Sequence, residues 1–177
     1  GLDAAPADPR PWLAGLVFHE ARLQPLNGTW VYRVEGPGGV RLLDATHGGV
    51  VTVDAAVVRA AAAARYAGSG AITAVTHHAP GALEARKHGA AWAVSYDDER
   101  GTTLWFSADD ARLLETRSDT WRVFDFFWML HTMDYRGRDD FNHPLVILFA
   151  TASLWVALTG ILLIVRVFRP KRAVPAT

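Results

Sequence analysis

The sequence predicts an α+β fold, with helices packed on antiparallel sheet, followed by one C-terminal transmembrane helix. The first observation behind this prediction is an uncharged run of 21 residues, 145–165, near the end of the chain. The second is a series of short strand-like runs separated by turns rich in glycine and aspartate. The third is an alanine-rich segment after Asp54, a residue type that often caps the first turn of a helix.

The first 50 residues are predicted to form a helix followed by a hairpin. Apolar residues recur there at the spacing of an amphipathic helix, namely Trp12, Leu13, Leu16, Val17 and Leu23. Asn27-Gly28 would end this helix. Strands are predicted at 29–35 and 40–45, joined by the glycine-rich turn 36–39, and Gly48-Gly49 closes the second strand.

The next 70 residues are predicted to form a second helix and more strands. The helix runs from its cap at Asp54 to Tyr66, and Gly68 ends it. Strands follow at 71–78, 91–96 and 102–107, with a further edge strand at 113–117. Residues 79–89 are predicted to be a loop, and 97–101 a turn.

One internal similarity indicates a duplicated unit. Residues 30–34 and 41–45 align with residues 92–96 and 103–107, at an offset of about 62 residues. Each copy is preceded by a segment that could hold a helix or a long loop. Two helix-plus-hairpin units of this kind would form a layer of antiparallel strands covered on one face by helices.

In their order along the chain, three stretches resemble the PepSY family, in the form that carries an associated transmembrane helix. The first is WVYRV (30–34) with VRLLDATHGG (40–49), and the second is WAVSYDD (92–98) with GTTLW (101–105). The third is WRVFDFFWMLH (121–131), which leads through Phe141-Asn142 to the apolar run. Together they cover most of residues 25–168. The second copy departs from the pattern, since Asp110 and Ala111 stand where the first has Gly48 and Gly49. Positive φ at Ala111 would be strained, so we expect that turn to be remodelled.

The resemblance implies an iron-regulated inner-membrane protein of bacteria. Some similar proteins are haem-containing ferric-siderophore reductases with several membrane helices. We expect an extracytoplasmic PepSY-like domain at 1–118, an aromatic interfacial helix and polar break at 119–140, a transmembrane helix at 141–168 and a cytoplasmic basic tail at 169–177. The basic residues after the apolar run place the C-terminus in the cytoplasm by the positive-inside rule, and the N-terminal domain in the periplasm.

The segment before the apolar run carries a row of aromatic side chains. Trp121, Phe124, Trp128 and His131 recur at i, i+3, i+7 and i+10, which places them on one side of a helix. Such a helix suits the membrane interface, where it would connect the domain to the bilayer. The alternative is a docking surface for another integral membrane subunit, to which Phe127 would also contribute.

The predicted transmembrane helix contains two residues that favour contact with another helix or a cofactor. Gly160 and nearby small residues would allow a second helix to approach closely. Trp155 lies near the middle of the run, an unusual depth for tryptophan, and exposure to lipid is equally open for it.

His131 and His143 bracket the polar break and are candidate axial ligands of a b-type haem. With a single membrane helix, the haem would have to be shared with a partner helix. The alternative is that both histidines are polar residues at the membrane interface. His77, His78 and His88 are interpreted as exposed histidines rather than a copper or zinc site, since neighbours on a strand point to opposite faces.

Composition excludes several function classes. The formal net charge is +0, so no basic surface is available for nucleic acid. The absence of cysteine rules out disulfides, thiolate metal sites and covalent haem attachment. No catalytic triad, zinc-protease motif or phosphate-binding glycine loop occurs.

The sequence therefore favours a membrane-anchored accessory subunit of an inner-membrane complex, linked to iron or electron transfer and acting by binding, with no catalytic residues. Its expected partners are the membrane and an integral membrane protein. One alternative is a part of a haem-dependent ferric reductase that uses His131 or His143. Another is a peptidase-inhibiting or peptide-binding module, in which the edge strand at 113–117 accepts an extended peptide.

Overall fold

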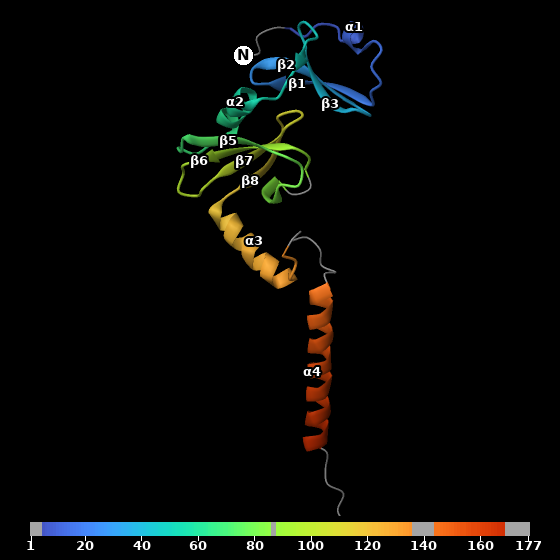
Figure 1. Cartoon of the computed structure of the whole chain (residues 1–177), viewed down its shortest axis with the longest axis vertical. Helices are drawn as coiled ribbons and strands as arrows, with labels where there is room; N and C mark the ends of the chain where they lie inside the picture. Colours follow the sequence, from blue (N-terminus) through green and yellow to red (C-terminus); the bar gives the residue numbers. More distant parts are fainter. Residues whose placement is uncertain (1–4, 86–87, 136–143, 169–177) are drawn as a thin grey trace, which may run out of the picture. The chain divides into compact units, whose positions relative to one another are not determined.

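A computed structural model describes residues 5–85, 88–135 and 144–168 (Figure 1). The chain divides into two compact units, Gly1–Arg122 and Val123–Thr177. The boundary lies inside a helix, a few residues beyond the predicted end of the exterior domain at 118.

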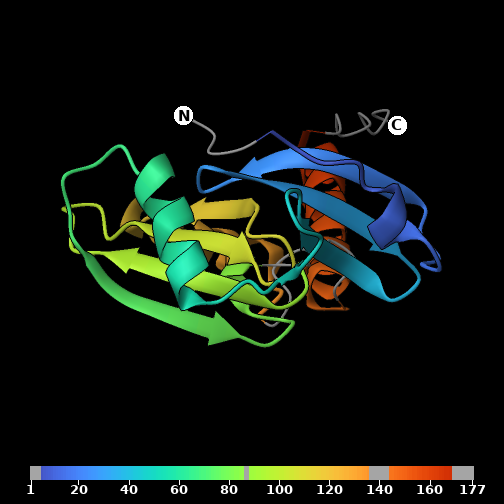
Figure 2. The same cartoon turned by 90° about the horizontal axis from the view of Figure 1, so that it is seen from above.

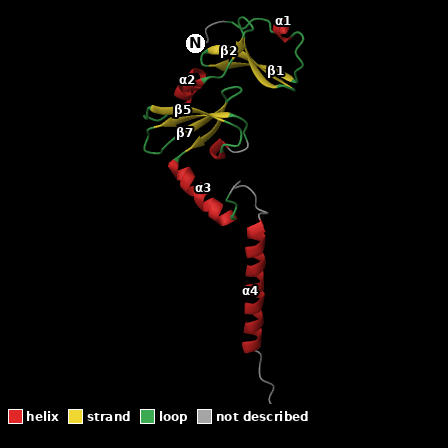
Figure 3. Ribbon diagram, viewed as in Figure 1, coloured by secondary structure: helices red, strands yellow, loops and turns green. Residues whose placement is uncertain are grey.

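The first unit begins with a four-stranded antiparallel sheet (Figure 3). The strands follow each other in space as they do in sequence, which makes a simple meander. They are β1 (Glu20–Leu26), β2 (Thr29–Gly36), β3 (Gly39–Asp44) and the short β4 (Val50–Val51). The predicted hairpin at 29–45 is confirmed, with Gly36 paired to Gly39 at its turn.

A second sheet repeats this arrangement, with the helix α2 (Ala55–Arg65) before it. Its strands, in spatial order, are β5 (Ile72–His78), β6 (Ala91–Tyr96), β7 (Thr103–Ser107) and β8 (Leu113–Arg117). The short 3-10 helix η1 (Leu83–Ala85) lies in the β5–β6 connection. The predicted strands and edge strand are thus present, and α2 lies across one face of this sheet (Figure 2).

Equivalent hydrogen bonds show that the two sheets are structural repeats. The Gly48 N–H donates to the Asp44 carbonyl at 2.9 Å, and the Ala111 N–H donates to the Ser107 carbonyl at 3.0 Å. Val31 pairs with Asp44 in the first sheet, and Ala91 pairs with Ser107 in the second. The predicted repeat is therefore present for the two hairpins, but the helix predicted for the first copy is absent from its described residues, where β1 precedes the hairpin instead. The alignment also shifts, because Trp92 corresponds to Tyr32 rather than to Trp30.

The second turn is not remodelled, contrary to the expectation from its sequence. Ala111 adopts φ +54°, close to the +73° of Gly48, its structural equivalent. A non-glycine residue in this region costs roughly 1 kcal/mol or more. The hydrogen bond from Ala111 to Ser107 and the burial of Ala111 keep the turn in the same conformation as the first.

The predicted helix over residues 12–23 is wrong. The helix α1 comprises only Arg10–Leu13, and Gly15 at φ +84° turns the chain away after one turn. Residues from Glu20 onward pair with β2 instead, which a local apolar spacing cannot reveal. Trp12 still covers the sheet, since its ring lies 6.4 Å from that of Tyr32.

One apolar core serves both repeats. Asp54 caps α2 as predicted, accepting hydrogen bonds at 2.9 Å from the Ala56 and Val57 N–H groups. The buried face of α2 packs with side chains from both sheets in a single cluster, which includes Leu26, Val31, Leu42, Val58, Ala61, Ala62, Val94, Leu104 and Phe106. Burial of this surface joins the two sheets into one unit.

Two helices lie at the C-terminal end of the chain. The first, α3 (Asp119–Thr132), starts in the first unit and continues into the second. The other, α4 (Pro144–Phe168), is 25 residues long and has a mean hydropathy of 2.3 over its most apolar window. Its length of roughly 37 Å exceeds the roughly 30 Å of a bilayer's hydrocarbon core, so α4 is long and apolar enough to cross a membrane.

The turn at Gly48, in the first repeat, gives a test of how Trp12 packs on the first sheet. In Gly48→Ala, the new methyl group would lie 2.4 Å from the Trp12 ring, on a residue that already has positive φ. We expect the free energy of unfolding to fall by about 2 kcal/mol, measured by urea denaturation of the full chain in nanodiscs. The control Gly89→Ala adds its methyl group to open space and should change stability by less than about 0.5 kcal/mol. Equal losses in the two variants would contradict this account.

Candidate functional site

The first turn of α3 is fixed to the second sheet by Arg122. Its guanidinium donates to the Glu84 carboxylate at 2.8 Å, to the Gly101 carbonyl at 2.8 Å and to the Thr103 hydroxyl at 3.1 Å. It also pairs with Asp119 at 2.9 Å, one turn earlier in the same helix. The start of α3 is therefore held by four side-chain contacts of one residue.

Trp121 takes part in the same anchor. The Arg117 guanidinium lies 3.9 Å from the centre of its ring, a cation–π geometry. The ring is half-buried, and the residue belongs to the first unit. Among the residues predicted to bind a partner, Trp121 thus already has a contact within the first unit.

Beyond the anchor, α3 carries exposed aromatic side chains. Phe124 and Phe127 are each 62% exposed. The Phe124 ring stacks with that of Trp128, at 6.1 Å between centroids, and Trp128 lies 6.1 Å from the His131 ring. The predicted row of rings along one side of the helix is therefore present from Phe124 to His131.

Sequence reasoning missed how far the exposed apolar surface extends around α3. Val123, Phe126 and Leu130 are also exposed. At 100° per residue, these three and the two phenylalanines above fall within roughly 160° of the helix circumference. We call these five residues the α3 apolar face. The opposite side holds Asp125 and Thr132, which are both buried.

The structure describes only one of the two predicted haem ligands. His131 is exposed and lies within the arc of the α3 apolar face, while His143 falls outside the described residues. A haem with two axial imidazoles needs a second histidine opposite the first. The described part of the second unit supplies one imidazole, so haem ligation by His131 and His143 stays a prediction.

The α4 residues singled out in the sequence lie on an open helix surface. Trp155 is 73% exposed, and a side-chain carbon added at Gly160 would meet no atom within 4 Å. The Thr151 hydroxyl donates to the Ile147 carbonyl at 2.7 Å, and Thr159 bonds the Trp155 carbonyl in the same way. These hydroxyls are satisfied within the helix, which suits an apolar environment.

Three further histidines, His77, His78 and His88, lie in or beside the second sheet. The His77 ring contacts Trp92 at 5.0 Å and the His78 ring contacts Trp105 at 4.9 Å, on opposite faces, as the strand geometry predicts. His88 lies 3.5 Å from the Glu115 carboxylate. Across the described ranges, no group of three or more His, Asp or Glu side chains is arranged to hold a metal ion.

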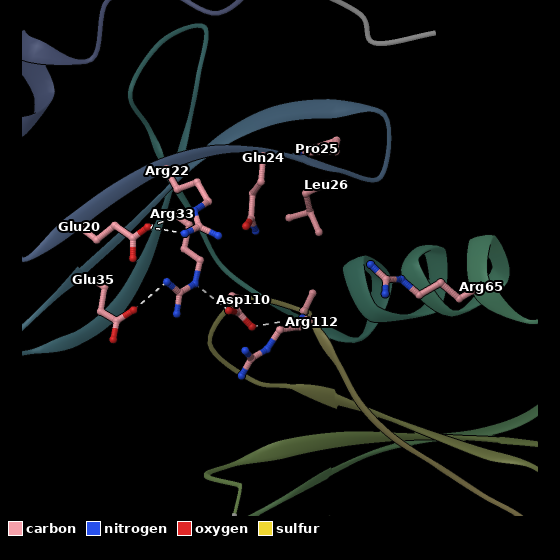
Figure 4. Close-up of a pocket in the computed structure, with 11 residues that line it drawn as sticks. Glu20, Arg22, Gln24, Pro25, Leu26, Arg33, Glu35, Arg65, Asp110 and Arg112 are labelled. Carbon is pink, nitrogen blue, oxygen red and sulfur yellow. Dashed lines mark hydrogen bonds and ion pairs between the residues drawn. The ribbon is translucent and has the colours of Figure 1, made fainter.

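A charged hollow of about 460 Å³ lies between the two sheets in the first unit (Figure 4). Its cationic residues are Arg22, Arg33, Arg65 and Arg112, and its acidic residues are Glu20, Glu35 and Asp110. The first sheet supplies alternate residues of β1 and β2, whose side chains share one face because Arg22 pairs with Arg33 and Glu20 with Glu35. The second sheet supplies the β7–β8 turn, and α2 supplies its last residue.

An ion pair between the repeats closes one wall of this hollow. The Arg33 guanidinium donates to the Asp110 carboxylate at 2.9 Å, and it pairs with Glu35 at 2.8 Å. Asp110 is only 4% exposed, and Arg33 is 19% exposed. Burial raises the pKa of Asp110, but hydrogen bonds from Arg33, Ser107 and the Arg112 N–H outweigh burial and lower that pKa below its usual value.

A second hollow, of about 420 Å³, adjoins the first and is mainly apolar. The two share Pro25, Leu26, Arg65 and Ala111. The apolar wall is completed by Ala60, Ala61 and Ala64 on one side of α2. We refer to the two hollows together as the inter-repeat groove. The groove was not predicted from the sequence, although the charged residues at 20 and 22 and at 33 and 35 show the alternation of strands with one polar face.

Comparisons with known protein families, with curated proteins and with solved structures find no match for this chain.

The ion pair of Asp110 gives a prediction with a defined pH dependence. Asp110→Asn leaves the half-buried Arg33 without this partner, so the free energy of unfolding should fall by about 2 kcal/mol at neutral pH. Because the folded pKa lies below the unfolded value of about 3.9, this stabilisation is complete above that value. It is lost as the pH falls through the folded pKa, so the variant and the native chain should converge in acid.

The matched control for this measurement is Asp109→Asn, in the exposed neighbour. Urea unfolding from pH 3 to 7 should show little difference between this control and the native chain. A difference between the Asp110 variant and the native chain that does not change with pH would show that the carboxylate charge is not what stabilises the turn.

Proposed function

We propose that this protein is a membrane-anchored accessory subunit of the PepSY type. In this proposal α4 crosses the bacterial inner membrane once, the repeat domain lies in the periplasm and the C-terminal tail lies in the cytoplasm. The protein acts by binding an integral membrane subunit, and the resemblance of its sequence to iron-regulated membrane proteins links that complex to iron or electron transfer.

The observation that carries the proposal is the inverted polarity of α3. A surface helix of a soluble domain normally buries its apolar side and exposes its polar side. In α3 the apolar face is exposed, whereas Asp125 and Thr132 on the opposite side are buried. Five large apolar side chains on one helix face indicate an apolar environment around it.

The position of α3 in the chain favours a membrane-embedded partner as that environment. Eleven residues of sequence separate its last residue, Thr132, from Pro144, where α4 begins. Aromatic side chains are enriched both at membrane interfaces and in the centres of protein interfaces. Stacked rings such as Phe124 and Trp128 present a rigid surface that loses little conformational entropy when it is covered.

The orientation of the chain can be tested directly, because the sequence contains no cysteine. Ser69→Cys places one thiol in the exposed loop after α2, and Thr177→Cys places one at the end of the basic tail. With the outer membrane permeabilised, a membrane-impermeant maleimide should label the first variant in intact cells. The second should react only after the inner membrane is dissolved, and the reverse pattern would contradict the proposed topology.

The docking surface can be tested by making it polar. Phe124→Ser with Phe127→Ser should reduce recovery of a copurifying integral membrane protein by at least about tenfold, since each change removes an aromatic side chain from the contact. Recovery is measured by quantitative mass spectrometry after purification of the tagged full chain in mild detergent.

The control is a double change of exposed apolar residues in the first unit, Val17→Ser with Val50→Ser, which should leave recovery unchanged. The proposal fails if the native chain is recovered with no integral membrane protein, or if the control loses its partner as completely as the α3 variant.

A further inference from the structure

We propose that the inter-repeat groove binds a small organic monoanion, a carboxylate attached to an apolar body. This site lies wholly within the first unit and goes beyond the proposed docking function of α3. Its two hollows, of about 460 and 420 Å³, each have the size of small-molecule sites in proteins.

The polarity of the groove changes along its length. The inner face of the first sheet is charged where Arg22 and Arg33 pair, and it is apolar at Leu26, near the end of the β1–β2 hairpin. The alanine side of α2 continues the apolar wall. A ligand that fills both parts must therefore have an apolar portion and a polar end.

Arg65 stands where the two parts meet, because it lines both hollows. Its side chain extends from the end of α2 toward the side of the groove where Leu26 lies (Figure 4). Within the part of the chain that the structure describes, no carboxylate lies within ion-pair distance of Arg65, whereas Arg22 pairs with Glu20, and Arg33 pairs with Glu35 and Asp110. Its guanidinium can offer a carboxylate two parallel hydrogen bonds.

The charge balance sets the charge of the ligand. Four arginines face three carboxylates, so the charged hollow carries one net positive charge. A polyphosphate or a nucleic acid would meet the acidic side chains Glu20, Glu35 and Asp110 without enough compensating cations. A single carboxylate neutralises the surplus charge, and the apolar part of the ligand then covers the exposed side chains of Pro25, Ala60 and Ala64.

The experiment uses the full chain in phosphatidylcholine nanodiscs, with fluorine NMR to follow three probes: fluorobenzoate, fluorophenylpropanoate and hexanoate with a terminal trifluoromethyl group. Each probe is compared with its primary amide, which keeps the apolar body and lacks the charge. Trifluoroacetate has the charge and almost no body. Empty nanodiscs give the contribution of the lipid.

At least one of the three carboxylates should bind the native chain about tenfold more tightly than both its amide and trifluoroacetate. Arg65→Gln should weaken that binding by about tenfold, the effect of losing one charge-assisted contact. Arg59→Gln, on the same helix outside the groove, should leave it unchanged. Arg65 is exposed to solvent, so its replacement should not unfold the protein. Weaker binding by the Arg65 variant would therefore report the loss of a contact with the ligand.

Three results would overturn the inference: no binding by any of the three carboxylates, equal binding of acid and amide, or equal binding by the native chain and the Arg65 variant. Partner recovery by α3 is measured separately and does not enter these outcomes. A failure of the docking proposal therefore leaves this test intact, and a failure here leaves the docking proposal intact.

Discussion

The first unit, Gly1–Arg122, depends on one apolar core that is shared by its two sheets. Leu42 comes from the first sheet, Val58 from α2 and Phe106 from the second sheet, and all three are almost fully buried in one cluster. Neither sheet has an independent core of this size, so each repeat completes the other. The shared core also fixes the distance between the β1–β2 hairpin and the β7–β8 turn, which is the distance that defines the groove.

The elements that sequence predicted well are those with strong local signals. Examples are the turn at Gly36 and Gly39, the cap at Asp54 and the apolar strand runs around Trp92 and Trp105. The helix predicted over residues 12–23 is wrong because long-range contacts outweigh the local signal there. An apolar spacing there suits a helix, but Gly15 and the long-range pairing of β1 with β2 decide the conformation.

The same distinction applies to the candidate sites. The aromatic row of α3 lies in one continuous segment, so its spacing could be read from sequence. The burial of Asp125 on the other side of the helix could not be predicted in this way, because it depends on contacts that the spacing of residues along a helix does not reveal. The groove was missed for a stronger reason: Arg33, Arg65 and Asp110 come from three distant segments that only the folded chain brings together.

The β7–β8 turn shows how two turns with the same backbone shape can make different contacts. The first repeat has a histidine and a glycine, His47 and Gly48, at the positions that Asp110 and Ala111 occupy in the second. The same backbone bend is therefore adopted by glycine in one repeat and by alanine in the other, and next to that alanine stands Asp110, the acidic residue that pairs with Arg33 of the first sheet. The two turns therefore share one backbone shape but differ in their side chains, and the ion pair that joins the repeats at this point comes from the second turn.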